Sequence, residues 1–158
     1  MIDFRQLLSA FVAQHAEVVV IGGLALTLRG GSRATYDLDL CYARSAENLP
    51  RVAAALAPLQ PRLRGADPSL PFFWDVATLR SGCNFTLVTT AGDVDLLGEV
   101  TGLGGYAAVL QRSSPMPLFG LEVPVLDLDG LERAKAAAGR AKDLIDLAEI
   151  ASLRSRRS

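Results

Sequence analysis

The chain has 158 residues, of which 50% are hydrophobic and 21% are charged, and its formal net charge at pH 7 is −1. These values fit a globular domain with a sizeable core and exclude a disordered chain. The longest apolar run, over 18–28, falls short of the roughly 20 residues that a membrane helix needs, and the N-terminus lacks the basic start of an export signal. We therefore expect a cytoplasmic protein without a membrane span.

The N-terminal part of the chain predicts helices and strands in alternation. Apolar residues at three-and-four spacing indicate a helix over 3–15, and a β-branched run indicates a strand over 18–21. A double glycine ends this strand, and a helical pattern follows over 24–29. A second strand is predicted over 37–42, where polar and apolar residues alternate.

The remaining patterns complete a fold of mixed class. In chain order they are a helix over 46–56, a loop over 58–71, strands over 84–89 and 94–97, two short strands within 117–125, and helices over 128–138 and 140–153. We predict one α/β (α+β) domain over 1–158, with a mixed sheet of at least four strands flanked by helices. Its core would span about 17–126, and a C-terminal helical pair would span about 127–153.

Histidine and cysteine are too scarce to carry the chemistry. His15 is the single histidine, and Cys41 and Cys83 stand far apart in the sequence. This argues against a multi-histidine metal centre and favours reduced thiols over a disulfide framework or a zinc site. Carboxylates, lysine, arginine and hydroxyl groups are left to act.

Two carboxylates share one face of the strand predicted over 37–42. Residues i and i+2 of a strand point to the same side, so Asp37 and Asp39 converge while the intervening leucines pack behind them. Like charges side by side repel unless a cation lies between them, and such oxygen ligands suit Mg²⁺. A second pair, Asp127 and Asp129, leads into a helix, and we interpret it as helix capping.

Two further motifs would complete a nucleotide site around Asp37 and Asp39. Gly22 and Gly23 link a strand to a helix, where a phosphate can approach the backbone closely, although a tight turn would also explain them. Asp95 on a later strand can bring a third carboxylate to the same metals, which would form a two-metal clamp for displacement at phosphorus. Asp93 shares that strand face, and spacing alone leaves its role open.

The combined motifs resemble a known family, the DNA polymerase beta nucleotidyltransferase superfamily in its minimal form. The matching motifs are Ile-Gly-Gly at 21–23, Asp-Leu-Asp-Leu at 37–40 and Val-Asp-Leu-Leu at 94–97. The stretches 33–39 and 138–144 further resemble the AbiEii-type nucleotidyltransferase toxins of abortive-infection toxin–antitoxin systems. The resemblance covers roughly residues 17–150.

This resemblance implies a nucleotidyltransferase fold and transfer of a nucleoside monophosphate from an NTP, such as ATP, to an acceptor hydroxyl. Asp37 and Asp39 would then ligate two Mg²⁺ or Mn²⁺ ions, and Asp95 would bind the catalytic ion and help to deprotonate the hydroxyl. Gly22 and Gly23 would line the triphosphate. The family often has serine where this chain has Gly23.

Lysine is rare in this chain, which draws attention to its two occurrences. Arginine is the usual basic residue here, so Lys142 indicates a need for a compact ammonium that offers a point charge to phosphate. In the resembled toxins the equivalent stretch lies near the active site, whereas we take Lys135 as a comparison residue outside it. The alternative is that Lys142 is an exposed helix residue. Arg33 and Thr35 precede the metal strand, and we predict that they bind nucleotide, with solvated loop positions as the alternative.

The leading hypothesis is an active nucleotidyltransferase whose catalytic residues are Asp37, Asp39, Asp95 and Lys142. Its acceptor would be an RNA or tRNA end or a protein, with a cognate antitoxin if the protein is a toxin, or a small molecule such as an antibiotic. A second hypothesis is a catalytically silent module that binds a nucleotide or a protein. A glycosidase is disfavoured, because two carboxylates two residues apart on one strand cannot flank a sugar. The sequence leaves open the acceptor, the preferred NTP and the oligomeric state.

Overall fold

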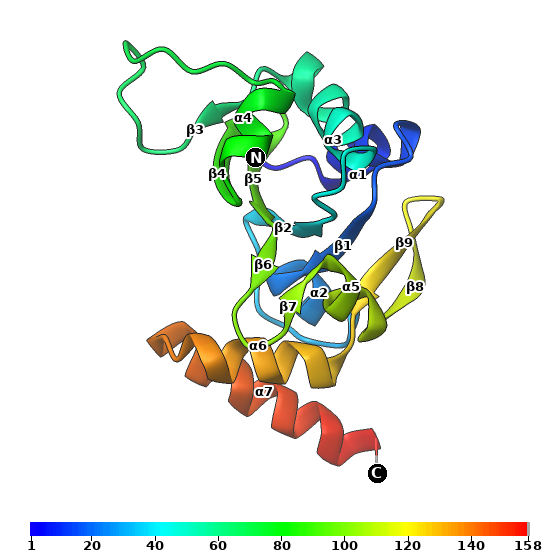
Figure 1. Ribbon diagram of the computed structural model, residues 1–158. Coiled ribbons are helices and arrows are strands. Elements are labelled where there is room, and N and C mark those ends of the chain that lie inside the picture. Colours follow the sequence, from blue (N-terminus) through cyan, green and yellow to red (C-terminus); the bar gives the residue numbers. More distant parts are fainter. Residues whose placement is uncertain (158) are drawn as a thin grey trace.

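The structure, a computed structural model, describes residues 1–157 and is built around one mixed β-sheet (Figure 1). Its seven strands lie in the spatial order β3 (Arg62–Leu63), β4 (Asn84–Thr89), β5 (Gly92–Leu97), β2 (Asp37–Tyr42), β1 (Val18–Ile21), β9 (Leu121–Leu126) and β8 (Ser113–Leu118). β2 is parallel to β5 and β1 is parallel to β9, whereas the other neighbouring pairs are antiparallel. A separate two-stranded sheet pairs β6 (Glu99–Val100) with β7 (Gly104–Gly105).

Helices flank the sheet at both ends (Figure 1). They are α1 (Phe4–Ala13), α2 (Gly22–Leu28), α3 (Asn48–Leu56), a 3₁₀ helix (Ala57–Leu59), α4 (Val76–Ser81), α5 (Tyr106–Gln111), α6 (Leu128–Ala138) and α7 (Ala141–Arg157). α1, α3 and α4 gather at one end, while α6 and α7 form a pair at the other. Within the described part of the chain, no helix has the length and apolar character that crossing a membrane requires.

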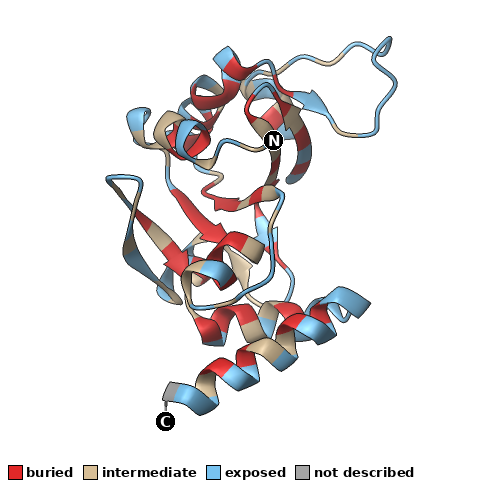
Figure 2. Cartoon of the chain, turned by 180° about the vertical axis from the view of Figure 1, so that it is seen from behind, coloured by how far each residue is buried: buried red, intermediate tan, exposed pale blue. Residues whose placement is uncertain are grey.

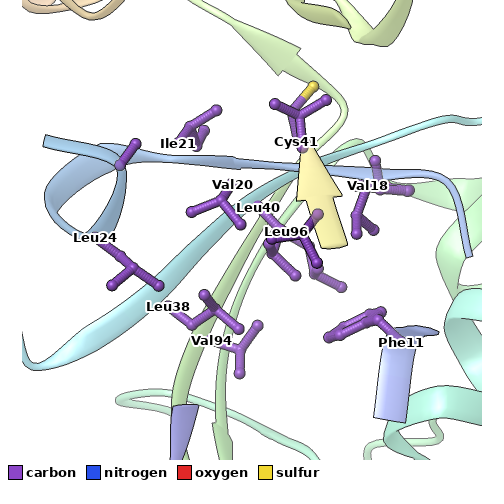
Figure 3. Packing of buried hydrophobic residues seen from close by; sticks show 14 of the residues in the cluster. Phe11, Val18, Val20, Ile21, Leu24, Leu38, Leu40, Cys41, Val94 and Leu96 are labelled. Atoms are coloured by element: carbon purple, nitrogen blue, oxygen red, sulfur yellow. The ribbon is translucent and has the colours of Figure 1, made fainter. Parts of the chain in front are cut away.

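One hydrophobic core joins the sheet to its helices, and Figure 2 shows the buried residues on their inner faces. At the centre, Leu38, Leu40 and Leu96 are completely buried and gather on one face of the sheet, whereas Ile21 and Cys41 lie on the opposite face (Figure 3). In the first part of β2, buried leucines alternate with half-buried aspartates, so a slip by one residue would move Asp37 and Asp39 into the core. This alternation also fixes the direction in which the two aspartates point.

The predicted α/β (α+β) fold with a mixed sheet, flanking helices and a helical C-terminus is confirmed. The differences concern short or unusual elements. The stretch over 58–71, predicted as a loop, contains β3, and the six-residue helices α4 and α5 are too short to produce a helical pattern. β8 begins at Ser113, before the expected start at Pro117. As an edge strand it tolerates proline, whose missing N–H group need not face a partner strand.

Candidate active site

Three carboxylates meet where β2 and β5 run side by side. Asp39 and Asp95 are direct partners across these parallel strands, and Asp37 lies on the same face two residues earlier. One ligand oxygen from each residue lies within 4.8 Å of the others, and all three residues are half-buried. The leucine face of the sheet behind them holds both strands in place.

Burial and, after it, mutual repulsion raise the pKa values of two carboxylates in this cluster. Burial raises the pKa of Asp39 from 3.8 to about 7, helped by the charges of Asp37 and Asp95 and by a side-chain hydrogen bond with Asp95. Burial and the charge of Asp95 likewise raise the pKa of Asp37, although nearby cations oppose this rise. A divalent cation among these carboxylates would favour their ionised forms.

The donor set fits a hard divalent cation. Carboxylate oxygens are the ligands that Mg²⁺ and Mn²⁺ prefer. In addition, the ligand oxygens of the three carboxylates lie within 4.8 Å of one another. Like charges this close are costly unless a cation lies between them. Asp37, Asp39 and Asp95 could thus hold magnesium or manganese.

The glycine turn lies directly against these carboxylates. β1 ends at Ile21, the register partner of Asp39, and α2 begins at Gly22. Gly22 has a φ of +66°, and a Cβ there would lie 2.8 Å from Cγ of Asp39, so only glycine fits. A side chain at Gly23 would begin 2.7 Å from Oγ1 of Thr35. The Thr35 hydroxyl therefore occupies the space that a serine at this position would need.

A cavity of about 720 Å³ lies between the carboxylates and the C-terminal helices. This volume is within the range of small-molecule sites. Asp93 and the exposed Tyr36 also line it. The cavity brings together all the residues that the sequence places in the site: Gly22, Gly23, Arg33, Thr35, Asp37, Asp39, Asp95 and Lys142.

Lys135 also lines this cavity, which corrects the expectation that it lies outside the site. Its side chain is only 10% exposed, and its Nζ lies 2.8 Å from Oδ2 of Asp146 and 3.7 Å from Oδ1 of Asp143. Its charge opposes the rise in the pKa of Asp39. Lys142, in the first turn of α7, is exposed and lines the same cavity. The rarity of lysine pointed to both residues, and Lys135 follows the buried Leu128 and Leu131 at helical spacing, which agrees with its inward position.

Two buried acids of α7 hold the cations on this side of the cavity. Asp143 accepts hydrogen bonds from Nε of Arg140 at 2.7 Å and from its backbone N–H at 3.0 Å. Burial alone would raise the pKa of Asp143, but its bonds to Arg140 keep this pKa below its usual value. Asp146 pairs with Arg33 at 3.3 Å as well as with Lys135. No sequence pattern points to this network, because Arg33 and Asp146 are more than a hundred residues apart in the chain.

Arg64 is a second residue that the sequence analysis missed. It follows β3, and its Nε lies 3.2 Å from Oδ2 of Asp93 while its Nη2 lies 3.0 Å from Oδ1 of Asp95. Nothing in a proline-rich stretch distinguishes this arginine from the others in the chain. Asp93 pairs with Arg64 and does not belong to the three-carboxylate cluster.

The second pair of aspartates was predicted to cap a helix, and this is confirmed for Asp127 but not for Asp129. Asp127 is the N-cap of α6 and accepts a hydrogen bond from the backbone N–H of Gly130 at 2.7 Å. Asp129 forms an ion pair with Arg154 on α7. Neither aspartate lines the cavity.

Solved structures share this fold over nearly the whole chain. LnuA, a lincosamide antibiotic adenylyltransferase solved with lincomycin bound, matches with a TM-score of 0.62 and 15% identity over 96% of this chain and 98% of its own. ANT(2'')-Ia, solved in complex with adenylyl-2''-tobramycin, matches with a TM-score of 0.58 and 15% identity over 97% and 95% of the two chains.

TM1012 from Thermotoga maritima, a candidate nucleotidyltransferase, matches with a TM-score of 0.60 and 16% identity over 94% and 93% of the two chains. These likenesses show that the chain has the fold of known nucleotidyltransferase structures. No protein-family model matches the chain, and no curated protein matches it.

Proposed function

We propose that this protein is a nucleotidyltransferase that moves a nucleoside monophosphate from an NTP to an acceptor hydroxyl. The observation that carries this proposal is the convergence of Asp37, Asp39 and Asp95 within 4.8 Å of one another beside the glycine turn. Across the cavity lie the cationic residues of the last two helices, which we call the helical wall: Lys135, Arg140 and Lys142. Catalysis of nucleotidyl transfer depends mainly on positioning the reacting groups and on stabilising the charge of the phosphates. Clustered carboxylates that can hold metal ions, with cations facing them, serve both purposes.

The three carboxylates divide two roles in this proposal. Asp37 and Asp39 would hold two Mg²⁺ or Mn²⁺ ions, and Asp95 would hold one of them and help to accept the proton of the acceptor hydroxyl. When bound, the ions would stabilise charge on the attacking and leaving oxygens. The protein contributes by fixing the three carboxylates on two paired strands, so that no rearrangement is needed during the reaction.

The triphosphate would lie between the glycine turn and the helical wall. Gly22 and Gly23 let its phosphates approach the backbone, and the Thr35 hydroxyl stands where the resembled family often has a serine hydroxyl. Arg33, Lys135 and Lys142 face this space and would neutralise phosphate charge, in agreement with their positions around the cavity.

For the acceptor, we propose an RNA end or a protein hydroxyl. A role as the toxin of a toxin–antitoxin system, with a cognate antitoxin as partner, rests on the sequence resemblance alone. A small-molecule acceptor is the second candidate. It is favoured by the likeness to LnuA and ANT(2'')-Ia and by a cavity of about 720 Å³, which suits a small molecule beside a nucleotide.

The test measures transfer of label from each α-labelled NTP into total RNA, total protein and a panel of small hydroxylated antibiotics. Wild type is compared with Asp39→Asn, and Asp129→Asn is the matched control, because it makes the same chemical change outside the cavity. We expect label in one acceptor class with wild type and Asp129→Asn, and none with Asp39→Asn.

The labelled fraction identifies the acceptor class. Binding of NTP without transfer into any fraction would instead favour the silent binding module. Transfer that survives in Asp39→Asn would contradict the assignment of the carboxylates.

A further inference from the structure

Arg64 follows β3 and contacts the carboxylate cluster through its guanidinium. Its guanidinium touches Asp95, a member of the cluster, and Asp93, which is not a member although it lies on the same strand face. Asp93 is also the register partner of Asp37, just as Asp95 is the partner of Asp39. Sheet geometry alone therefore offers four carboxylates to a cation, and something must determine which of them bind it.

The position of Arg64 is set independently of these carboxylates. Its backbone N–H donates to the carbonyl of Thr86 at 2.9 Å, and its Nη2 donates to the carbonyl of Leu87 at 2.8 Å. Its contacts with Asp93 and Asp95 are ion pairs rather than aligned hydrogen bonds, because its Nε has no hydrogen-bond partner among the described residues. β4 thus holds a fixed positive charge against β5, and the carboxylates adapt to it.

We propose that Arg64 is a positioning residue that determines which carboxylates take part in the metal site. It neutralises Asp93 and keeps that side chain out of the metal set, and it draws one oxygen of Asp95 aside so that the other remains for the cation. This role of Arg64 rests on the proposed function. It explains why four carboxylates on two paired strands give a metal cluster of only three.

The consequence of losing Arg64 differs from that of losing an ordinary ligand-supporting residue. Without the guanidinium, a positive charge near the site disappears and Asp93 becomes free to join the metal set. Metal binding should therefore become tighter, whereas turnover should fall because Asp95 is no longer held in one orientation. For comparison, the loss of a residue that supports a metal ligand typically lowers affinity or activity about 10- to 100-fold.

The experiment is a calorimetric titration of the metal-free full chain with Mn²⁺, in the absence of nucleotide. It compares wild type, Arg64→Met, Arg64→Met with Asp93→Asn, and Arg62→Met. Arg62 is the matched control, since it lies two residues earlier and forms no ion pair within residues 1–157. A carboxylate that joins the metal set brings one more negative charge to within several ångström of a divalent ion, which in water-like surroundings changes affinity about tenfold, and we expect a gain of this size for Arg64→Met. Adding Asp93→Asn should remove it, and Arg62→Met should match wild type.

Two results would overturn the proposal. Unchanged or weaker Mn²⁺ binding in Arg64→Met would mean that Arg64 does not restrain the carboxylates. A gain that persists after Asp93→Asn would mean that the guanidinium merely fills the place of a cation. If Arg64→Met fails to fold, Arg64→Lys decides in its place. A single ammonium can pair with only one of the two acids, so a smaller gain of the same sign is expected.

Transfer of label from NTP by the same variants gives a second readout. Arg64→Met should lower kcat about tenfold or more while the KM for NTP stays within about threefold of wild type. A raised KM with unchanged kcat would instead make Arg64 a triphosphate contact and overturn the positioning role. Asp39→Asn keeps the two proposals distinguishable. If Asp39→Asn abolishes Mn²⁺ binding, the metal site stands whatever Arg64 does, and if no variant binds Mn²⁺, the proposed function fails first.

Discussion

Replacing Lys135 by methionine separates the structural and functional contributions of the buried ion pair. Lys135 and Asp146 are 10% and 3% exposed, and 2.8 Å separates their charged atoms. Removing one partner of a buried pair typically costs about 3–5 kcal/mol, because the other charge is left uncompensated. Here Asp146 keeps Arg33 at 3.3 Å, so we expect the lower end, about 3 kcal/mol of unfolding free energy. For a chain of this size the melting temperature should fall by about 6–12 °C.

The double variant Lys135→Met with Asp146→Asn removes both charges. It should recover at least half of the lost stability, measured by chemical denaturation, because no buried carboxylate is left unpaired. Transfer of label from NTP should stay reduced on the order of 100-fold in both variants, since a fixed cation beside the triphosphate is missing. If the double variant regains transfer along with stability, Lys135 is only structural and our reasoning is refuted. Lys142→Ala is the matched control. Because Lys142 is exposed, this change should reduce transfer and leave the melting temperature of the protein unchanged.

Three further predictions concern the carboxylates and the elements that support them. The folded-state pKa of Asp39 is raised to about 7, so below that pH protonation stabilises the metal-free fold and competes with cations. The affinity for Mg²⁺ should therefore rise about tenfold from pH 6 to pH 8. An affinity that calorimetry finds independent of pH would contradict this. Gly22→Ala places an alanine at a φ of +66° with its Cβ against Asp39. It should cost about 1–3 kcal/mol of stability, measured by thermal melting, and weaken Mn²⁺ binding, measured by titration. Asp127→Ala should cost about 1 kcal/mol through the lost cap of α6 and leave transfer per folded molecule unchanged, and a large loss of transfer would place this residue in the site.

The sequence predicts those parts of the fold that depend on local patterns. The strands over 18–21 and 37–42 have the expected bounds, because alternation and β-branching mark them and the glycine turn ends the first. Strand alternation also placed Asp37, Asp39 and Asp95 on one face, although it could not show that β2 and β5 are neighbours. That pairing joins segments far apart in the chain, and only the assembled sheet brings Asp39 opposite Asp95.

What the sequence could not predict comes from contacts between distant elements. Arg64 acts from a stretch that is mostly loop, and its relation to Asp93 exists only because β4 lies next to β5. Lys135 follows Leu128 and Leu131 at helical spacing, which places it on the buried face of α6, but a lysine at such a position gives no sign of the partner that makes its burial possible. Its partner Asp146 is on the next helix, and the turn between them determines that the two side chains meet.

The division of the site between the sheet and the last two helices has a consequence for how the protein matures. The ribosome completes β2 and β5 before α6 and α7, and domains fold as their segments emerge. A nascent chain that ends before Leu128 carries the clustered acids but lacks Lys135, Arg140 and Lys142. On the proposed function, such a chain would lack the cations that neutralise the triphosphate. The two halves of the site would come together only once α7 packs against α6 and brings Asp146 to Lys135.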